Sequence, residues 1–240
     1  MDAGGSSLLG FLQEQVFRNR NAGKGISRRR AMLQLAFLAC GTTAKGALFQ
    51  ADGLVAIPAS RGYLLVDPKK CQGCLNCMVA CSMVHHGEAS LSLSRIQVVH
   101  DHLGNFPDDV IIAQCRQCVE PACLRACPSG ALTADSSQWN VRKVNAEECI
   151  GCWACVEACP FPLARSIRNH EADRAEKCDL CADTPYWTER SGPRDKLACL
   201  EICPVHAIAY TEEIPAQEGD AGYLVNLRGK AWKQTGFSTD

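Results

Sequence analysis

The chain has 240 residues, a formal net charge of −1 and only 6% aromatic residues. A nearly neutral chain offers no electrostatic basis for binding nucleic acid or an anionic membrane. Its 17 cysteines are far above ordinary usage. Clusters or disulfides are therefore expected to supplement the apolar core of one or two domains.

The first 58 residues are predicted to be an N-terminal extension that carries an export signal. Ser27-Arg28-Arg29-Arg30 precedes an apolar stretch over residues 31–40, as in a twin-arginine signal. The stretch is too short to cross a bilayer, and a basic helix on the protein surface is the alternative. We expect a periplasmic or exported protein, or otherwise a cytoplasmic one.

Short strands are predicted along the rest of the chain, at residues 61–66, 95–100 and 109–114. A hairpin is expected from residues 129–133 and 139–144, and a related strand from residues 204–210. These strands alternate with cysteine groups. Internal repetition of this kind favours one duplicated fold over four unrelated metal loops.

Setting aside Cys40, which we interpret as an incidental residue of the signal, sixteen cysteines fall into four groups of four. The groups are Cys71, Cys74, Cys77 and Cys81; Cys115, Cys118, Cys123 and Cys127; Cys149, Cys152, Cys155 and Cys159; and Cys178, Cys181, Cys199 and Cys203.

The third group, followed by Pro160, has the CxxCxxCxxxC-Pro spacing of bacterial ferredoxins, which ligate [4Fe–4S] clusters. A disulfide scaffold would explain an even count but not the repeated CxxC steps. Zinc needs two CxxC pairs and gives no reason for a third cysteine or the proline. Sixteen thiolates suffice for four cubane clusters.

In two-cluster ferredoxins the fourth cysteine of each run ligates the other cluster. Groups two and three are separated by one hairpin and so form an inner module, while groups one and four form an outer module. Exchange of fourth ligands then predicts four sites. Site 1 is Cys71, Cys74, Cys77 and Cys203; site 2 is Cys178, Cys181, Cys199 and Cys81; site 3 is Cys115, Cys118, Cys123 and Cys159; site 4 is Cys149, Cys152, Cys155 and Cys127.

The predicted fold is α+β, a duplicated two-cluster ferredoxin with short hairpins and short helices around four cubanes. The outer module spans residues 59–108 and 166–212, and the inner module spans 109–165. Residues 182–198 are a loop that is either a solvated insertion or a docking loop. Residues 213–240 are a tail for which a frayed terminus is the default and a partly ordered segment that packs on a partner is the alternative.

Over residues 60–212, the order and spacing of the four groups resemble the four-cluster electron-transfer subunits of molybdenum and tungsten oxidoreductases. Residues 81–88 and 91–96 are similar to small subunits that accompany aldehyde oxidoreductase-type tungsten enzymes. The resemblance implies a molybdenum- or tungsten-containing catalytic partner near the module that holds Cys71. It also implies a second partner, either a membrane quinone-reactive subunit or a soluble electron carrier.

No constellation for substrate chemistry is present, so we expect an electron carrier without catalytic residues. The alternatives are a free-standing polyferredoxin and a structural zinc or disulfide protein. Gly73 and Gly151 are predicted to allow close backbone approach to the clusters. His85 and His86 are interpreted as surface or interface residues, and Trp153 as a shield against water.

Basic residues close to the cysteines would raise cluster potentials by stabilising the reduced form, although solvated surface charges are the alternative. The candidates are Lys69, Lys70, Arg116 and Arg125.

Overall fold

A computed structural model describes residues 50–51, 54–55, 57–106, 109–187, 191–193, 195–229 and 232. The chain divides into two compact units, residues 1–47 and 48–240, and all the described residues belong to the second. The predicted export signal and Cys40 lie outside the described residues. Within the described residues, no helix has both the length and the apolar character that a membrane crossing requires.

One order of elements occurs four times: a leading strand, a cysteine loop, a helix and a trailing strand. The repeats are β3 (Tyr63–Val66), α3 (Asn76–His86) and β4 (Gln97–His100); β5 (Val110–Ala113), α4 (Ala122–Arg125) and β6 (Leu132–Asp135); β7 (Val141–Val144), α5 (Ala154–Glu157) and β8 (Ser166–Asn169); and β9 (Arg174–Lys177), α6 (Ala198–Glu201) and β10 (Ile208–Thr211). The further elements are β1 (Gln50–Ala51), β2 (Leu54–Val55), and the 3₁₀ turns η1 (Ser136–Gln138) and η2 (Ala221–Tyr223).

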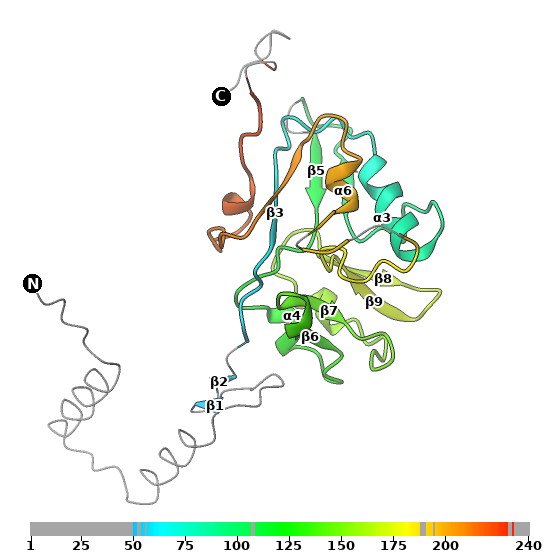
Figure 1. Ribbon diagram of the computed structural model, residues 1–240, viewed down its shortest axis with the longest axis vertical. Helices are drawn as coiled ribbons and strands as arrows, with labels where there is room; N and C mark the ends of the chain where they lie inside the picture. Colours follow the sequence, from blue (N-terminus) through cyan, green and yellow to red (C-terminus); the bar gives the residue numbers. More distant parts are fainter. Residues whose placement is uncertain are drawn as a thin grey trace, which may run out of the picture. The chain divides into compact units, whose positions relative to one another are not determined.

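The strands pair in antiparallel twos that connect the repeats in a closed cycle. Each trailing strand pairs with the next leading strand, giving β4–β5, β6–β7 and β8–β9, and the last strand β10 returns to pair with β3. Figure 1 shows β10 beside β3, although they come from opposite ends of the described chain. The helices pack as α3 with α6 and α4 with α5. The first repeat therefore lies with the fourth, and the second with the third.

The predicted strands are confirmed as β3, β4, β5, the hairpin β6–β7, and β10. The hairpin β8–β9 is not among the predictions. Its strands, Ser-Ile-Arg-Asn and Arg-Ala-Glu-Lys, carry charges that the ordinary pattern places in solvent. Glu176 and Lys177 are nevertheless buried.

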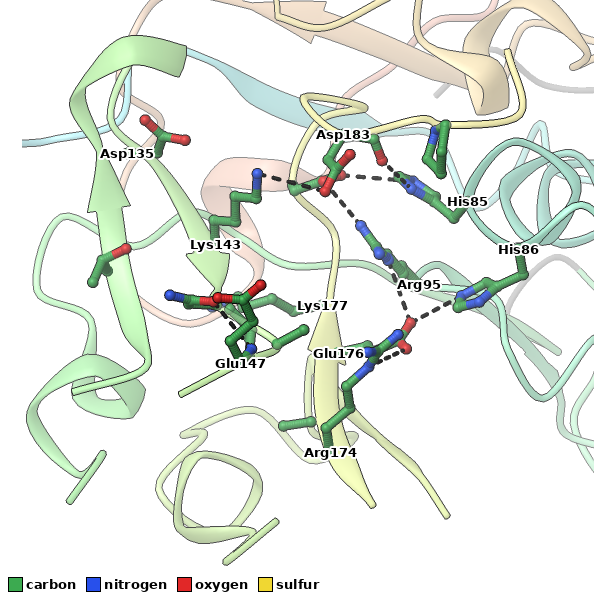
Figure 2. A pocket seen from close by; sticks show the side chains of 17 residues that line it. His85, His86, Arg95, Asp135, Lys143, Glu147, Arg174, Glu176, Lys177 and Asp183 are labelled. Carbon is green, nitrogen blue, oxygen red and sulfur yellow. Dashed lines mark hydrogen bonds and ion pairs between the residues drawn. The ribbon is translucent and has the colours of Figure 1, made fainter. Parts of the chain in front are cut away.

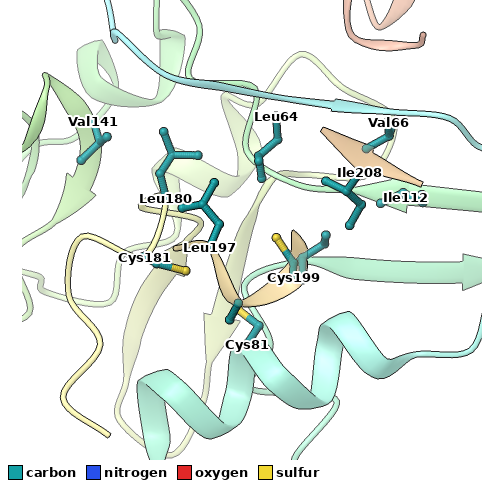
Figure 3. Close-up of a cluster of buried hydrophobic side chains, with 12 residues drawn as sticks. Leu64, Val66, Cys81, Ile112, Val141, Leu180, Cys181, Leu197, Cys199 and Ile208 are labelled. Atoms are coloured by element: carbon teal, nitrogen blue, oxygen red, sulfur yellow. The ribbon is translucent and has the colours of Figure 1, made fainter. Parts of the chain in front are cut away.

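The main core combines aliphatic side chains with cysteines, as Figure 3 shows. Leu64 and Val66 of β3 and Ile208 of β10 pack with Cys81 and Cys199 from α3 and α6. Burial of each aliphatic side chain contributes about 1.5–3 kcal/mol. The thiols of Cys81 and Cys199 thus lie inside the apolar core.

The C-terminal segment, residues 214–229, packs against the body through buried and hydrogen-bonded residues. Tyr223 is 1% exposed, and Leu224 forms a bridge with Val66. The buried Asp67 carboxylate accepts from Leu227 N at 2.8 Å and from Arg228 Nε at 3.1 Å. The expectation of a frayed terminus is therefore wrong for these residues, because their polar groups have partners in the body.

The beginning of the predicted loop also lies against the body. Tyr186 N donates to the carbonyl of Val84 on α3 at 3.2 Å, and Trp187 packs on the main core. The described residues 183–187 are thus docked on α3 of the first repeat.

Candidate metal centres

The four cysteine loops share a backbone conformation. The residue before the second cysteine of each group has positive φ: 62° at Gly73, 50° at Gln117, 65° at Gly151 and 55° at Leu180. Such turns point successive backbone N–H groups into a concavity of the kind that binds anions, including iron–sulfur clusters. Gly73 N and Gln117 N each lie 3.4 Å from the Sγ of the cysteine two residues earlier.

The two glycines in these loops are also closely packed. A Cβ on Gly73 would collide with the ring of His100, whose Nε2 lies 3.1 Å from the Gly73 carbonyl oxygen. A Cβ on Gly151 would lie 2.6 Å from the carbonyl oxygen of Asp173. Glycine at both positions satisfies the turn and the neighbouring chain together.

The thiol of Cys203 lies with the first cysteine group. Burial, together with charge repulsion from the neighbouring thiols of Cys71, Cys74 and Cys203, raises the pKa of Cys77 to about 12. The same thiols, Cys74 and Cys203, also face Cys71. These are the four residues of predicted site 1.

The thiol of Cys81 lies correspondingly with the fourth group. Burial raises the pKa of Cys199 well above its usual value, with repulsion from Cys181, Cys178 and Cys81. Burial likewise raises the pKa of Cys181 to about 12, and Cys81 again contributes. These are the four residues of predicted site 2.

The inner repeats bring thiols together in the same manner. Burial, with contributions from Cys115 and Cys123, raises the pKa of Cys118 to about 11. Cys159, the remaining member of predicted site 3, follows α5, which packs against α4, and its Sγ accepts from Arg165 N at 3.3 Å. One small cavity is lined by all four thiols of predicted site 4, which are Cys127, Cys149, Cys152 and Cys155.

Neighbouring sites approach one another, because a thiol of each site interacts electrostatically with a thiol of the next. Cys199 of site 2 lies near Cys77 of site 1, and Cys178 of site 2 lies near Cys115 of site 3. Cys155 of site 4 lies near Cys123 of site 3. These three pairs of thiols place the four sites in the sequence 1, 2, 3 and 4, each beside the next.

This donor set fits iron–sulfur clusters. The sixteen cysteines of the described residues are all free thiols, so none is held in a disulfide there. In the same residues, no three cysteine, histidine or carboxylate side chains are arranged to hold a single metal ion. Buried thiols with raised pKa values are poor thiolates by themselves and need a metal centre to stabilise the deprotonated form.

Of the predicted basic residues, only Arg116 is fully buried, and its Nε donates to Asp220 at 2.8 Å. Arg125 is exposed beside Glu120, and Lys70 Nζ donates to the carbonyl of Leu227. Lys69 is half-buried.

One basic side chain that donates to a cysteine sulfur is absent from the sequence analysis. Lys177 is 4% exposed, and its Nζ lies 3.4 Å from Cys123 Sγ. Burial alone would lower the pKa of Lys177, but Cys115 and Cys123 raise it overall. The position of Lys177 directly before Cys178 is the sequence feature that could have indicated a lysine close to the thiols.

Of the two histidines interpreted from the sequence as surface or interface residues, the structure shows that His85 is buried and His86 half-buried. Both rings point into a pocket of about 550 Å³ between α3 and the strands β6, β7 and β9 (Figure 2). His85 is 6% exposed, and its Nδ1 donates to the Asp183 carbonyl at 2.7 Å. His86 Nε2 lies 3.0 Å from the buried carboxylate of Glu176. Glu176 of β9 thus holds the ring of His86 inward, whereas the Asp183 carbonyl and the Asp179 carboxylate, 3.6 Å from Nε2, hold the ring of His85.

The ring of Trp153 packs against the site 4 thiols of Cys149 and Cys155, and the Arg168 guanidinium lies 5.5 Å from its centroid. Half-buried beside these thiols, the ring reduces the access of water to this part of the molecule.

Short strands, short helices and loops that gather buried thiols define a small ferredoxin-like iron–sulfur domain of the α+β class. Comparison with known proteins agrees: residues 109–213 match the family of the 4Fe-4S dicluster domain. The electron transport protein HydN of Escherichia coli is 36% identical over 166 residues, covering 61% of this chain and 85% of HydN.

Two further relatives are subunits of oxidoreductases. The polyferredoxin-like subunit of the aliphatic sulfonate oxidoreductase of Pyrococcus furiosus is 36% identical over 143 residues, 60% of this chain and 72% of that protein. The thiosulfate reductase electron transfer subunit PhsB of Salmonella typhi is 31% identical over 152 residues, 61% of this chain and 73% of PhsB.

The chain belongs to the family of 4Fe-4S dicluster electron-transport proteins. It is an iron–sulfur electron-transfer protein and not a catalytic one.

Proposed function

We propose that this chain relays single electrons through four [4Fe–4S] clusters, held at sites 1 to 4, within a duplicated ferredoxin fold. The observation that carries the proposal is the succession of neighbouring thiols in adjacent sites, Cys77 with Cys199, Cys178 with Cys115 and Cys123 with Cys155. Each cluster supplies reversible one-electron chemistry at a potential set by burial, charge and hydrogen bonds to sulfur.

The residues of this chain have three tasks in such a relay. The thiols supply four ligands to each site, and positive-φ turns such as those at Gly73 and Gly151 direct backbone N–H groups towards the sulfurs. The aliphatic core around Cys81 and Cys199 excludes water. Cys203 of group four belongs to site 1, and Cys81 of group one belongs to site 2. These two sites therefore connect the first repeat with the last.

The proposed partners are a catalytic subunit with a molybdenum or tungsten cofactor and a second redox protein. The second partner is either a membrane quinone-reactive subunit or a soluble carrier. The names of the Pyrococcus and Salmonella relatives, both subunits of oxidoreductases, support an assembly of this type. The resemblance of residues 81–96 to the small subunits of tungsten enzymes agrees with it.

A second candidate function is that of a free-standing polyferredoxin, which the name of HydN, an electron transport protein, favours. Affinity purification of the chain from its native cells under anaerobic conditions separates the two. A stoichiometric partner that contains molybdenum or tungsten supports the subunit, whereas recovery of the chain alone supports the free carrier.

The cluster count is tested on the chain purified anaerobically. We expect about sixteen irons and sixteen sulfides per chain, brown colour, and EPR signals of four reduced clusters after dithionite. Cys152→Ala should remove one cluster, while Cys40→Ala should leave the iron content unchanged. A colourless, EPR-silent chain with zinc or disulfides in place of iron would refute the proposal.

Export by the twin-arginine route is a further part of the proposal, because this route carries folded proteins with assembled cofactors. Replacement of Arg28 and Arg29 by lysine should retain the protein in the cytoplasm, as measured by cell fractionation. Unchanged fractionation would leave the basic-helix alternative.

A further inference from the structure

Lys177 occupies the junction of sites 2, 3 and 4. It is the last residue of β9 and directly precedes Cys178 of site 2. Its Nζ lies 3.4 Å from Cys123 Sγ and also contacts the Cys115 thiol, and both belong to site 3. The Cys155 thiol of site 4 lies near the same ammonium group.

The ammonium of Lys177 has no carboxylate partner within ion-pair distance among the described residues. Other buried cations do have one: Arg95 pairs with Asp179 at 2.9 Å, and Arg116 with Asp220 at 2.8 Å. An uncompensated buried charge is costly, so its counter-charge must come from groups that it touches. Those groups are the sulfurs of site 3.

Arg142 adds a second buried cation on the same side. Its side chain is fully buried, and it donates to the Cys118 carbonyl at 2.8 Å and to the Pro58 carbonyl at 2.7 Å. Among the described residues it too pairs with no carboxylate. Lys177 and Arg142 are therefore two buried cations beside site 3 that have no carboxylate partner among the described residues.

Site 2 has a different electrostatic environment. The Asp179 carboxylate, between Cys178 and Cys181 in the sequence, interacts with both thiols, and Arg95 pairs with it at 2.9 Å. Site 3 thus has more unpaired buried positive charge around it than site 2, although similar cysteine loops build both sites.

We propose that Lys177 raises the midpoint potential of site 3 and so makes the centre of the relay more readily reduced. The inference rests on the proposed function. Site 3 gains one electron from a neighbouring site and passes one on, and no bond forms or breaks. The extra negative charge of the reduced site is stabilised by an ammonium in direct contact with two of its ligand sulfurs, in a water-excluded setting.

The test is an EPR-monitored redox titration of the anaerobically purified full chain. Lys177→Gln keeps an N–H donor but removes the charge, and Lys177→Arg keeps the charge. Lys143→Gln is the matched control, because Lys143 is on the adjacent strand β7 and pairs at 3.5 Å with Asp183 at a partly exposed position. Cys118→Ala identifies the signal of site 3 by its loss.

We expect the site 3 midpoint potential to become clearly more negative in Lys177→Gln, while Lys177→Arg and Lys143→Gln stay close to the unsubstituted protein. An unchanged potential at full iron content in Lys177→Gln overturns the inference. If Lys177→Gln loses iron, the Lys177→Arg variant is used in its place. An unchanged site 3 potential in Lys177→Arg then supports the inference. A large negative shift of that potential, although the charge is retained, overturns it. Absence of clusters from the unsubstituted chain would instead remove the proposed function itself.

Discussion

Arg116, inside the second cysteine group, donates from Nε to the Asp220 carboxylate of the C-terminal segment at 2.8 Å. Arg165, whose backbone N–H faces Cys159 Sγ, donates to the same carboxylate at 3.0 Å. One acidic residue thus pairs with two buried guanidinium groups beside site 3. The C-terminal segment is in this way part of the structure that surrounds the inner thiols.

Asp220→Ala is therefore expected to destabilise the protein by about 3 kcal/mol, because removal of one partner leaves buried charges uncompensated. The measurement is chemical unfolding of the anaerobic protein, followed by the loss of visible absorbance. Glu218→Ala, at an exposed position of the same segment, is the control and should change little. Equal stability of the two variants would show that Asp220 has no such role.

The second prediction concerns the exchange of fourth ligands. Cys71 and Cys203 face one another and belong to one predicted site, so Cys71→Ala/Cys203→Ala should lose no more iron than either single variant, about four atoms. Cys199→Ala/Cys203→Ala affects two predicted sites and should lose about eight. Residues that act in one unit give non-additive losses, whereas separate sites add. If the iron losses of the two double variants were reversed, ligands would not be exchanged.

The sequence predicted most strands because their apolar residues alternate near turn residues, and β3 to β7 follow that pattern. It could not predict β8–β9. Glu176 on β9 is buried with His86 and Arg95 of the first repeat, which become its neighbours only after the repeats close into a cycle. Charge in a strand predicts exposure unless the partner is known, and here the partners are distant in sequence.

The same limit applies to the candidate sites. Cysteine spacing is local, so the groups follow from sequence alone. The contact of Lys177 with Cys123 and the docking of Arg228 on Asp67 depend on long-range packing. No spacing rule indicates either contact, and sequence analysis accordingly assigned potential tuning to other basic residues and treated the tail as frayed.

A third prediction compares two glycines with left-handed backbone. Gly151 has φ +65°, and a methyl group added there would lie 2.6 Å from the carbonyl oxygen of Asp173, whereas Gly130 has φ +72° and open space. Gly130→Ala should lower the free energy of unfolding only by the cost of holding a residue with a Cβ at positive φ, about 1–2 kcal/mol. Gly151→Ala should cost more and lower the iron content at site 4, as measured by unfolding and iron analysis. Equal effects would show that the Asp173 contact is unimportant.

The last prediction concerns acid stability. Burial lowers the pKa of His85 from 6.5 to about 4, against the opposing attraction of Asp179. Between these values the unfolded chain binds the proton and the folded chain does not, so stability falls as pH drops from 6.5 towards 4, by up to about 3 kcal/mol. His85→Gln should flatten this dependence in denaturant titrations from about pH 7 to about pH 5. Exposed His102→Gln is the control and should keep the slope. An unaltered slope in His85→Gln would mean that other groups cause the acid sensitivity.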